Sequence, residues 1–404
     1  MEETVMAVTS AEQARETATE KERKSAFRSV LGSTVALEFG LGLQRGIFNN
    51  FVVEKLHIQP DQLGFVQSIR EVPGLFTAPL ATVQGFFREN VWAGICLLIT
   101  ALGLFLHTMV FSIPMLLVAT LVLSTGFHLF YPVQSSIVMK SALPSLRATR
   151  MGQLHSGAAA SSLASVLLIM LVSRARGTNY GLLHAIAAAF AVCGGLAVLL
   201  RSVNNVESSK RAIDYNPRYV SYYVLTFLGG SRRHVTMTFA GFLLVETFHT
   251  QVSVMVLLSA VSSVIAIITR PLIGKMIDAW GEQRSLVVNY SLVMTLFASY
   301  AFVRSPLVLY AIYVLDNGLM GFDVAITTHL GKIAPREVLS AAYAMGSTIN
   351  HLSGVAVPAI GGLLWKTAGG PTVFISGCFI AVLSLAYSRT LEKRERQANA
   401  GVAG

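Results

Sequence analysis

Several ionisable side chains lie inside long apolar stretches of this sequence. Glu38 and Arg45 are seven residues apart, which places them on one face of a helix. Asp316 and Asp323 share a face of a later stretch in the same way. An arginine can bind an anion, and a carboxylate in apolar surroundings can exchange a proton near neutral pH. Because ionisable groups at membrane depth usually face a cavity or a partner, these residues are candidates for substrate binding and proton coupling.

Other polar groups accompany these charges. Ser124, His128 and Tyr131 lie on one face of their own apolar stretch. His351 follows Asn350 in another stretch. A lone histidine in an apolar helix is either a packing residue with a backbone partner or a proton relay, and both interpretations remain open for His351.

The composition places these residues in a membrane protein. Hydrophobic residues make up 53% of the 404 residues and charged residues 13%, with a mean hydropathy of +0.60. Lys and Arg concentrate in the tails and in the loops on one side, while the loops on the other side carry only Lys55, Arg174, Arg176, Arg304 and Lys366. The positive-inside rule therefore places both termini in the cytoplasm of a plasma or inner membrane. The net charge of +10 then reflects topology, and no nucleic acid partner is expected.

Twelve apolar stretches are long enough to cross about 30 Å of hydrocarbon. They cover residues 27–53, 62–86, 91–110, 114–139, 151–173, 180–201, 219–245, 253–277, 286–303, 305–330, 340–366 and 371–389. We predict an all-α polytopic fold with two six-helix bundles at 27–201 and 219–389, joined by a linker at 202–218. Cytoplasmic tails are expected at 1–26 and 390–404, and the charged first tail is expected to be frayed.

The two bundles are predicted to be copies of one unit. The heptapeptide VEKLHIQ starts at Val53, and VETFHTQ starts at Val245, which is 192 residues later. The same offset relates Lys140 to Lys332. Six helices are thus followed by six related helices, which indicates a pseudo-symmetric arrangement with polar faces meeting across a central space.

The depth of Arg232 and Arg233 depends on where the seventh helix begins. If it begins after Arg233, the two arginines flank the membrane; if the repeat holds, it begins near Tyr219. Arg233 then lies deep in the span, on the face that corresponds to Glu38 and Arg45, and we favour this interpretation. Gly229 and Gly230 are then expected to mark a soft or broken point of the helix.

Two further patterns allow simple structural interpretations. Arg70 and Glu71 are adjacent, and adjacent residues on a helix do not face each other, so each is expected to find a partner on another helix. Two Glu-x-x-His patterns, at Glu54 and Glu246, fall at outer helix ends, where polar caps are expected. The sequence has no phosphate-binding loop, nucleophile motif or Cys/His metal spacing, so we predict no enzyme activity, no cofactor and no metal site.

One loop of the second half resembles a signature of the major facilitator superfamily. Gly274, Asp278, Gly281 and Arg284 fit the G-x-x-x-D-x-x-G-x-x-R pattern of that family between helices eight and nine. The resemblance implies a gating role for these four residues. The first-half copy differs, because Thr82 and Phe86 stand where Gly and Asp are expected.

The resemblance implies a secondary active transporter that works by alternating access. The mixture of charges in the spans predicts a small polar or anionic solute, and the deep carboxylates predict protons as the coupling ion. Arg45 and Arg233 would supply positive charge, and Glu38, Asp316 and Asp323 would supply exchangeable carboxylates. Alternatively, the charges form gating bridges, and recognition is left to Gln44, Asn49, Tyr131, Gln134 and Asn317. A membrane sensor or assembly partner without net transport is the other functional class. A monomer would suffice for either, and the sequence does not set the oligomeric state.

Overall fold

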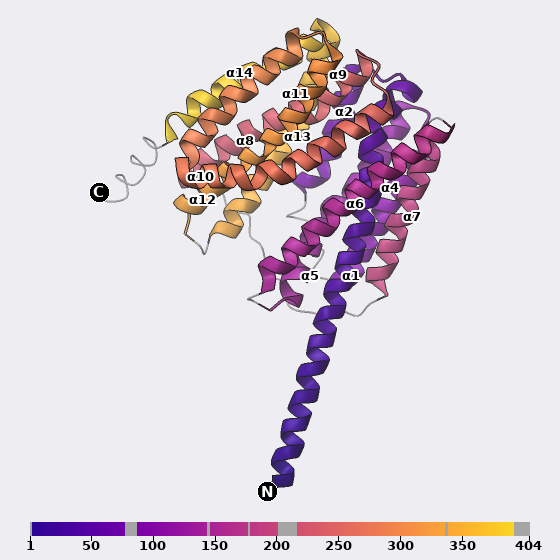
Figure 1. The fold of residues 1–404 in the computed structure, drawn as a ribbon, viewed down its shortest axis with the longest axis vertical. Coiled ribbons are helices and arrows are strands. Elements are labelled where there is room, and N and C mark those ends of the chain that lie inside the picture. Colours follow the sequence, from indigo (N-terminus) through magenta and orange to yellow (C-terminus); the bar gives the residue numbers. More distant parts are fainter. Residues whose placement is uncertain are drawn as a thin grey trace, which may run out of the picture.

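The computed structural model of the chain is all-helical and describes residues 2–76, 87–143, 146–176, 178–200, 216–335 and 338–391. These ranges contain no strand. Two helical bundles lie side by side in Figure 1, one formed by the first half of the chain and one by the second. The predicted all-α fold class is therefore confirmed.

The helices of the first half follow the predicted spans closely. They are α1 (Glu2–Leu56), α2 (Pro60–Leu75), α4 (Glu89–His107), α5 (Ile113–Ser141), α6 (Arg147–Arg176) and α7 (Tyr180–Leu199). The predicted second span ran to residue 86, but residues 77–86 lie outside the described part of the chain, and so do Thr82 and Phe86.

The second half has the same order of helices, with two interruptions. Its elements are α8 (Val220–Val235), a π-helical segment (Thr236–Ala240), α9 (Gly241–Glu246), α10 (Val252–Phe302), α11 (Pro306–Leu319), a 3₁₀-helical segment (Met320–Asp323), α12 (Val324–Ile333), α13 (Leu339–Ala368) and α14 (Gly370–Ser388). The predicted seventh span corresponds to α8 and α9 with the π-helical segment between them. The predicted tenth span likewise corresponds to α11 and α12.

Seven helical stretches of the described chain are long and apolar enough to cross a membrane. Some of the remaining predicted spans fall short for visible reasons. The described part of α2 has 16 residues, and the π-helical segment divides the seventh span into pieces of 16 and 6 residues. The structure is thus consistent with twelve spans, which are not all unbroken apolar helices.

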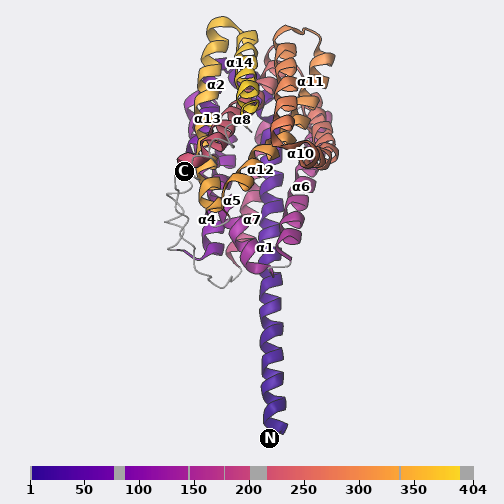
Figure 2. The same cartoon turned by 90° about the vertical axis from the view of Figure 1, so that its left-hand side faces the viewer.

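The N-terminal tail differs from its prediction. The structure has it helical from Glu2 and continuous with α1, which projects well beyond the bundle in Figures 1 and 2. Its sequence is rich in Ala, Glu, Lys and Arg, which favour helix, and Glu20 and Lys24 form an i,i+4 ion pair at 2.5 Å. The prediction of a frayed tail considered its charge and gave too little weight to its helix propensity.

The predicted loop between the eighth and ninth helices is reduced to a sharp bend. α10 runs through both spans, and Gly281 is its non-helical residue, with φ 78° and ψ 166°. This backbone region is open essentially to glycine alone. The second glycine of the loop pattern is therefore needed for its conformation.

A Gly281→Ala substitution should destabilise the protein by about 1–3 kcal/mol, the usual cost of forcing a side chain into this backbone region. No atom lies within 4 Å of an added Cβ, so the effect is conformational and not a clash. Thermal unfolding in detergent would measure it. Gly274→Ala is the matched control, because that glycine also has free space and has no positive φ. Equal midpoints for the two variants would contradict the prediction.

The seventh helix is interrupted at a different point from the one predicted. Gly229 and Gly230 lie inside regular α-helix in α8, and the π-helical turn follows at Thr236–Ala240. Both glycines have close neighbours, because an added Cβ would lie 2.8 Å from Ile326 and 2.4 Å from Ser353 respectively. The two glycines therefore allow neighbouring helices to pack closely. The irregular turn lies further along the chain, just after the arginines. Single π-helical turns are frequent at functional sites.

The two halves meet at the ends of the helices that lie away from the N-terminal tail (Figures 1 and 2). Asn50 donates a hydrogen bond to the carbonyl of Thr250 at 2.9 Å, and Ser68 donates to the carbonyl of Val355 at 2.6 Å. At the same end, an ion pair joins Lys366 to a carboxylate of α2, Asp61, at 2.8 Å.

Glycines and prolines bring α2 and α13 into close contact there. An added Cβ on Gly64 would lie 2.1 Å from the carbonyl oxygen of Pro358, and one on Gly362 would lie 2.5 Å from that of Pro60. Pro358 itself lies inside the continuous helix α13. The Pro-Gly pattern of α13 therefore allows tight packing between the halves, which was not expected from its sequence.

Candidate functional site

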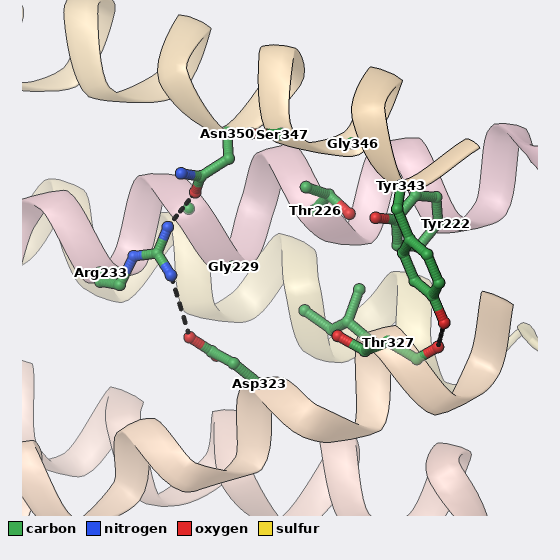
Figure 3. A pocket seen from close by; sticks show the side chains of 12 residues that line it. Tyr222, Thr226, Gly229, Arg233, Asp323, Thr327, Tyr343, Gly346, Ser347 and Asn350 are labelled. Atoms are coloured by element: carbon green, nitrogen blue, oxygen red, sulfur yellow. Dashed lines mark hydrogen bonds and ion pairs between the residues drawn. The ribbon is translucent and has the colours of Figure 1, made fainter. Parts of the chain in front are cut away.

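A cavity of about 270 Å³ lies in the second half, between α8, α12 and α13 (Figure 3). Arg233 projects into it from α8, and its guanidinium donates a hydrogen bond to the side-chain oxygen of Asn350 on α13. The same guanidinium lies 3.8 Å from a carboxylate oxygen of Asp323. The other lining residues are Tyr222, Thr226, Gly229, Gly230, Ile326, Thr327, Tyr343, Gly346 and Ser347.

A second arginine lies behind the cavity wall. Arg232 and Asp316 both have fully buried side chains, with Nη2 3.4 Å from Oδ1. Thr236 donates a hydrogen bond to the other oxygen of Asp316 at 2.8 Å. Arg232 Nη1 also lies 3.9 Å from Asp323, so that carboxylate is shared between the two arginines. Two positive and two negative charges therefore compensate one another, and the Arg232–Asp316 pair does so fully buried.

The local helix geometry explains this division. Consecutive residues on an α-helix point about 100° apart, so Arg232 points to the interior and Arg233 to the cavity. On the facing helix, Asp316 is buried in α11 and Asp323 ends the 3₁₀-helical segment. Both carboxylates remain within reach of α8, as their shared face predicted.

The structure also places both arginines well inside the seventh helix. α8 begins at Val220, so Arg232 lies roughly 18 Å along the helix at 1.5 Å per residue. The interpretation in which they flank the start of the span does not apply. The sequence singled out Arg233 as a site residue and gave less weight to Arg232, although the side chain of Arg232 is the more buried of the two. The signal that could have identified Arg232 is its place beside Arg233 within an apolar, repeated stretch.

The first half contains a smaller charge cluster. Arg45 pairs with Glu38 at 2.7 Å, and Tyr131 donates a hydrogen bond to the other oxygen of Glu38 at 2.7 Å. The predicted common face of Glu38 and Arg45 is therefore present, with α5 contributing the tyrosine. No described hydrogen bond or ion pair joins this cluster to Asp316, Asp323 or Arg233, and the two groups stay in their own halves.

A Tyr131→Phe substitution should lower the free energy of unfolding by about 1.5–3 kcal/mol, because it removes a hydrogen bond to a charged, largely buried acceptor. Thermal unfolding of the purified protein would measure the loss. Tyr310→Phe is a suitable control, since the partner of its hydroxyl among the described residues is the neutral hydroxyl of Thr250, at 3.1 Å. The control should lose about 0.5–1.5 kcal/mol. A larger loss in the control than in Tyr131→Phe would contradict the prediction.

His128 and His351 come together although they lie in different halves. Their ring centroids are 5.0 Å apart, and His351 Nδ1 lies 3.0 Å from Oε2 of Glu71. The sequence proposed no site role for Glu71, and nothing in its local pattern pointed to His351 as its partner.

The prediction for Arg70 and Glu71 was partly wrong. Their side chains pair at 3.2 Å, because a long arginine side chain can turn back toward its neighbour even though the two Cβ atoms diverge. The second oxygen of Glu71 does find a partner on another helix, namely His351. Arg70 forms its described ion pair with Glu71 and not with Glu38.

The four residues of the family-like loop lie along α10, where Gly274, Asp278 and Arg284 flank the bend at Gly281. Asp278 and Arg284 are both in the described chain, and no ion pair joins them in this structure. A different ion pair joins α10 to α12 in this region. Lys332 lies 2.5 Å from Glu282. Burial would raise the pKa of Glu282, but the hydrogen bonds to its carboxylate, chiefly the one from Lys332, together with the charge of Lys332 outweigh burial, and the pKa is lowered.

The first half contains the counterpart of that charge pair. Lys140 lies 2.9 Å from Glu89, at the same ends of the corresponding helices. Lys140 and Lys332 are the two lysines related by the 192-residue offset. The repeat therefore preserves an ion pair as well as the helix order.

Both the sequence and the fold of the chain are similar to those of known proteins. The sequence model described as Major Facilitator Superfamily matches residues 30–322 and, overlapping, residues 222–404. A mutant of the nucleoside transporter NupG has a similar structure, with TM-score 0.75, 13% identity, and coverage of 90% of this chain and 98% of that one. A bacterial homologue of the human lysosomal transporter Spinster, in an inward-facing and occupied conformation, gives TM-score 0.74 and 12% identity, with 93% and 98% coverage. No protein of curated function matches the chain.

Proposed function

Because the chain belongs to the major facilitator superfamily, we propose that it is a secondary transporter that moves a small polar or anionic solute by alternating access. Membership establishes a multi-span membrane protein in a family of transporters, not of enzymes. The structural likeness, at 12–13% identity, adds the fold alone. The choice of solute and the coupling therefore depend on the residues of this chain.

The position of Arg233 in the cavity carries the proposal. Its guanidinium has five N–H donors, and its carboxylate neighbour Asp323 lies at 3.8 Å, which is beyond a normal hydrogen bond. An anionic or polar solute entering the cavity could take up those donors. Asn350, Thr226 and Ser347 add neutral polar groups around the same space.

The arrangement of the halves supports an inward-open state. The described contacts between the halves lie at the end away from the N-terminal tail, whereas Tyr222 and Tyr343 place the cavity near the starts of α8 and α13. With both termini in the cytoplasm of a plasma or inner membrane, the cavity faces the cytoplasm. The opposite state would separate α2 from α13 and close the family-like loop of Gly274, Asp278, Gly281 and Arg284.

Asp323 is the best-placed residue for coupling to protons. Its carboxylate lines the cavity and neighbours both arginines, so its protonation would free positive charge for the solute. Asp316 is fully enclosed and is bonded by Arg232 and Thr236, which suits a structural counter-ion to Arg232. Glu38, Arg45 and Tyr131 would form the corresponding first-half wall, and His128 and His351 join the halves.

Two experiments in sequence test this proposal. A thermal-shift screen of the purified protein against a library of small metabolites should find a solute that stabilises the native state. Uptake of that solute into sealed vesicles is then measured with and without a pH gradient. We expect gradient-driven accumulation by the wild type, and exchange without accumulation by Asp323→Asn. Normal accumulation by that variant would show that Asp323 is not the coupling residue.

A sensor or assembly partner without net transport is the second candidate. The observation in its favour is the first-half loop, where Thr82 and Phe86 replace the Gly and Asp of the family pattern. Indifference of vesicle uptake to every stabilising solute and to the gradient, with retained binding of a partner protein, would favour this function.

A further inference from the structure

A separate polar cluster connects the two halves through α2, α5, α8 and α13. Glu71 of α2, His128 of α5 and His351 of α13 each offer one potential ligand atom, and these atoms lie within 4.8 Å of one another. Glu71 Oε2 and His351 Nδ1 are already 3.0 Å apart. Two ligands on one tetrahedral zinc ion with bonds of about 2.0–2.1 Å are separated by roughly 3.3 Å. Small side-chain rotations would thus bring these three atoms onto one ion.

A fourth potential ligand faces the same space. His234 of α8 is only 4% exposed, and its Nε2 has no hydrogen-bond partner among the described residues. A Cβ on Gly354 would lie 2.8 Å from both His234 Nε2 and Glu71 Cγ, so the two side chains share the space beside that glycine. A buried nitrogen without a partner is costly, and binding of an ion would satisfy it.

The surroundings of His128 prepare it as a ligand. Its Nδ1 lies 3.0 Å from the carbonyl oxygen of Ser124, which can only accept, so Nδ1 carries the proton of that bond and Nε2 keeps its lone pair. The hydroxyl of Ser124 lies 2.8 Å from the same nitrogen and donates to the carbonyl of Arg70. Histidines that bind metals usually donate their other ring N–H to a carbonyl or carboxylate in this way.

The charges of the cluster leave one carboxylate oxygen for an ion. Arg70 lies 3.2 Å from Oε1 of Glu71, while Oε2 faces His351. Arg70 would hold the carboxylate from outside, as supporting residues of metal sites do. Neutral imidazoles and a carboxylate are the ligands that zinc and similar divalent ions prefer.

We propose that Glu71, His128, His234 and His351 bind a divalent transition-metal ion of the Zn²⁺ type. Glu71 and His128 belong to the first half, and His234 and His351 belong to the second. A bound ion would therefore link the halves along the contact between α2 and α13 and stabilise the state seen here. The site adjoins the cavity, because His234 and His351 directly follow Arg233 and Asn350, but none of its four residues lines the cavity, and the proposal does not depend on the proposed solute. It also departs from the sequence-based expectation of no metal.

The test uses the full-length protein, purified without a histidine tag and treated with a chelator. Titration with Zn²⁺, followed by calorimetry and by thermal unfolding, should show one tight ion per chain and a raised unfolding temperature. Glu71→Gln and His351→Gln should each weaken binding by more than about tenfold, the smallest loss that changes around metal ligands usually cause. His155→Gln, at an exposed position on α6, is the matched control and should bind as the wild type does.

A second measurement does not depend on the folding of any variant. Co²⁺ bound to the wild type by imidazole and carboxylate in a tetrahedral site should give visible absorption that Zn²⁺ abolishes. A spectrum identical to that of aqueous Co²⁺ would overturn the proposal. So would Zn²⁺ binding that is unchanged in Glu71→Gln and His351→Gln but lost on removal of His57 and His249 at the outer helix ends.

A Gly354→Ala variant adds a test of the geometry. It removes no ligand atom, but its methyl group would occupy the space beside Glu71 and His234. We expect weaker Zn²⁺ binding than in the wild type. Unchanged affinity would count against His234 as the fourth ligand.

Discussion

Replacement of Arg232 by methionine is expected to lower the free energy of unfolding by roughly 3–5 kcal/mol, because it leaves Asp316 buried without its counter-ion. Both side chains are fully enclosed, and Thr236 would be the remaining described hydrogen-bond partner of that carboxylate. Unfolding of the purified protein in detergent, by heat or by denaturant, measures the loss. Methionine has a similar length, so loss of packing contributes little.

A double variant separates charge compensation from packing. Arg232→Met combined with Asp316→Asn removes both charges, and it should recover most of the stability that the single variant loses. Arg233→Met, next to it in the chain, should cost less, because that side chain lines the cavity and is partly solvated. A double variant as unstable as Arg232→Met would show that the packing of the arginine, and not its charge, stabilises the helix pair.

Replacement of Arg233 by alanine is expected to weaken binding of the transported solute roughly 10- to 100-fold, the equivalent of about 1.5–3 kcal/mol for a hydrogen bond to a charged group. The solute would lose the guanidinium that now faces the cavity between Asp323 and Asn350. Binding is measured by calorimetry or by the concentration dependence of the thermal shift, with a solute found in the screen.

Two matched variants sharpen this second prediction. Arg233→Lys keeps the charge but loses the planar pair of donors, so it should restore affinity only in part if the solute is anionic. Thr226→Ala, at another position of the cavity wall, should change affinity much less. Full affinity in Arg233→Ala would show that the solute binds elsewhere. The first-half cluster of Glu38, Arg45 and Tyr131 would then be the next candidate for the binding site.

Several parts of the candidate site were predictable from the sequence. Glu38 with Arg45, and Asp316 with Asp323, were recognised because a seven-residue spacing on a helix fixes a common face regardless of packing. The deep position of Arg233 followed from the 192-residue repeat, since VETFHTQ fixed the outer end of its helix. These predictions depend on distances along one helix or on the offset between two copies.

Other parts of the candidate site could not be predicted from the sequences of single helices. Hydropathy gave no sign that Arg232 would turn toward Asp316 while Arg233 turns toward the cavity, because this depends on how α8 is rotated against α11. The ion pair of Arg70 with Glu71 was judged from Cβ directions alone, which neglects the reach of the arginine side chain. Gly229 and Gly230 of α8 were interpreted as a soft or broken point, yet they allow neighbouring helices to approach.

The sequence by itself determined a membrane-embedded, duplicated helical chain with charges buried in its spans, because hydropathy and repetition are properties of the linear order of residues. Only the tertiary structure decided which charges neutralise each other, and which end of the paired bundles is closed. It also brought together Glu71, His128, His234 and His351, which are far apart in the chain. Such contacts depend on the rotation and crossing of helices, which no single span encodes.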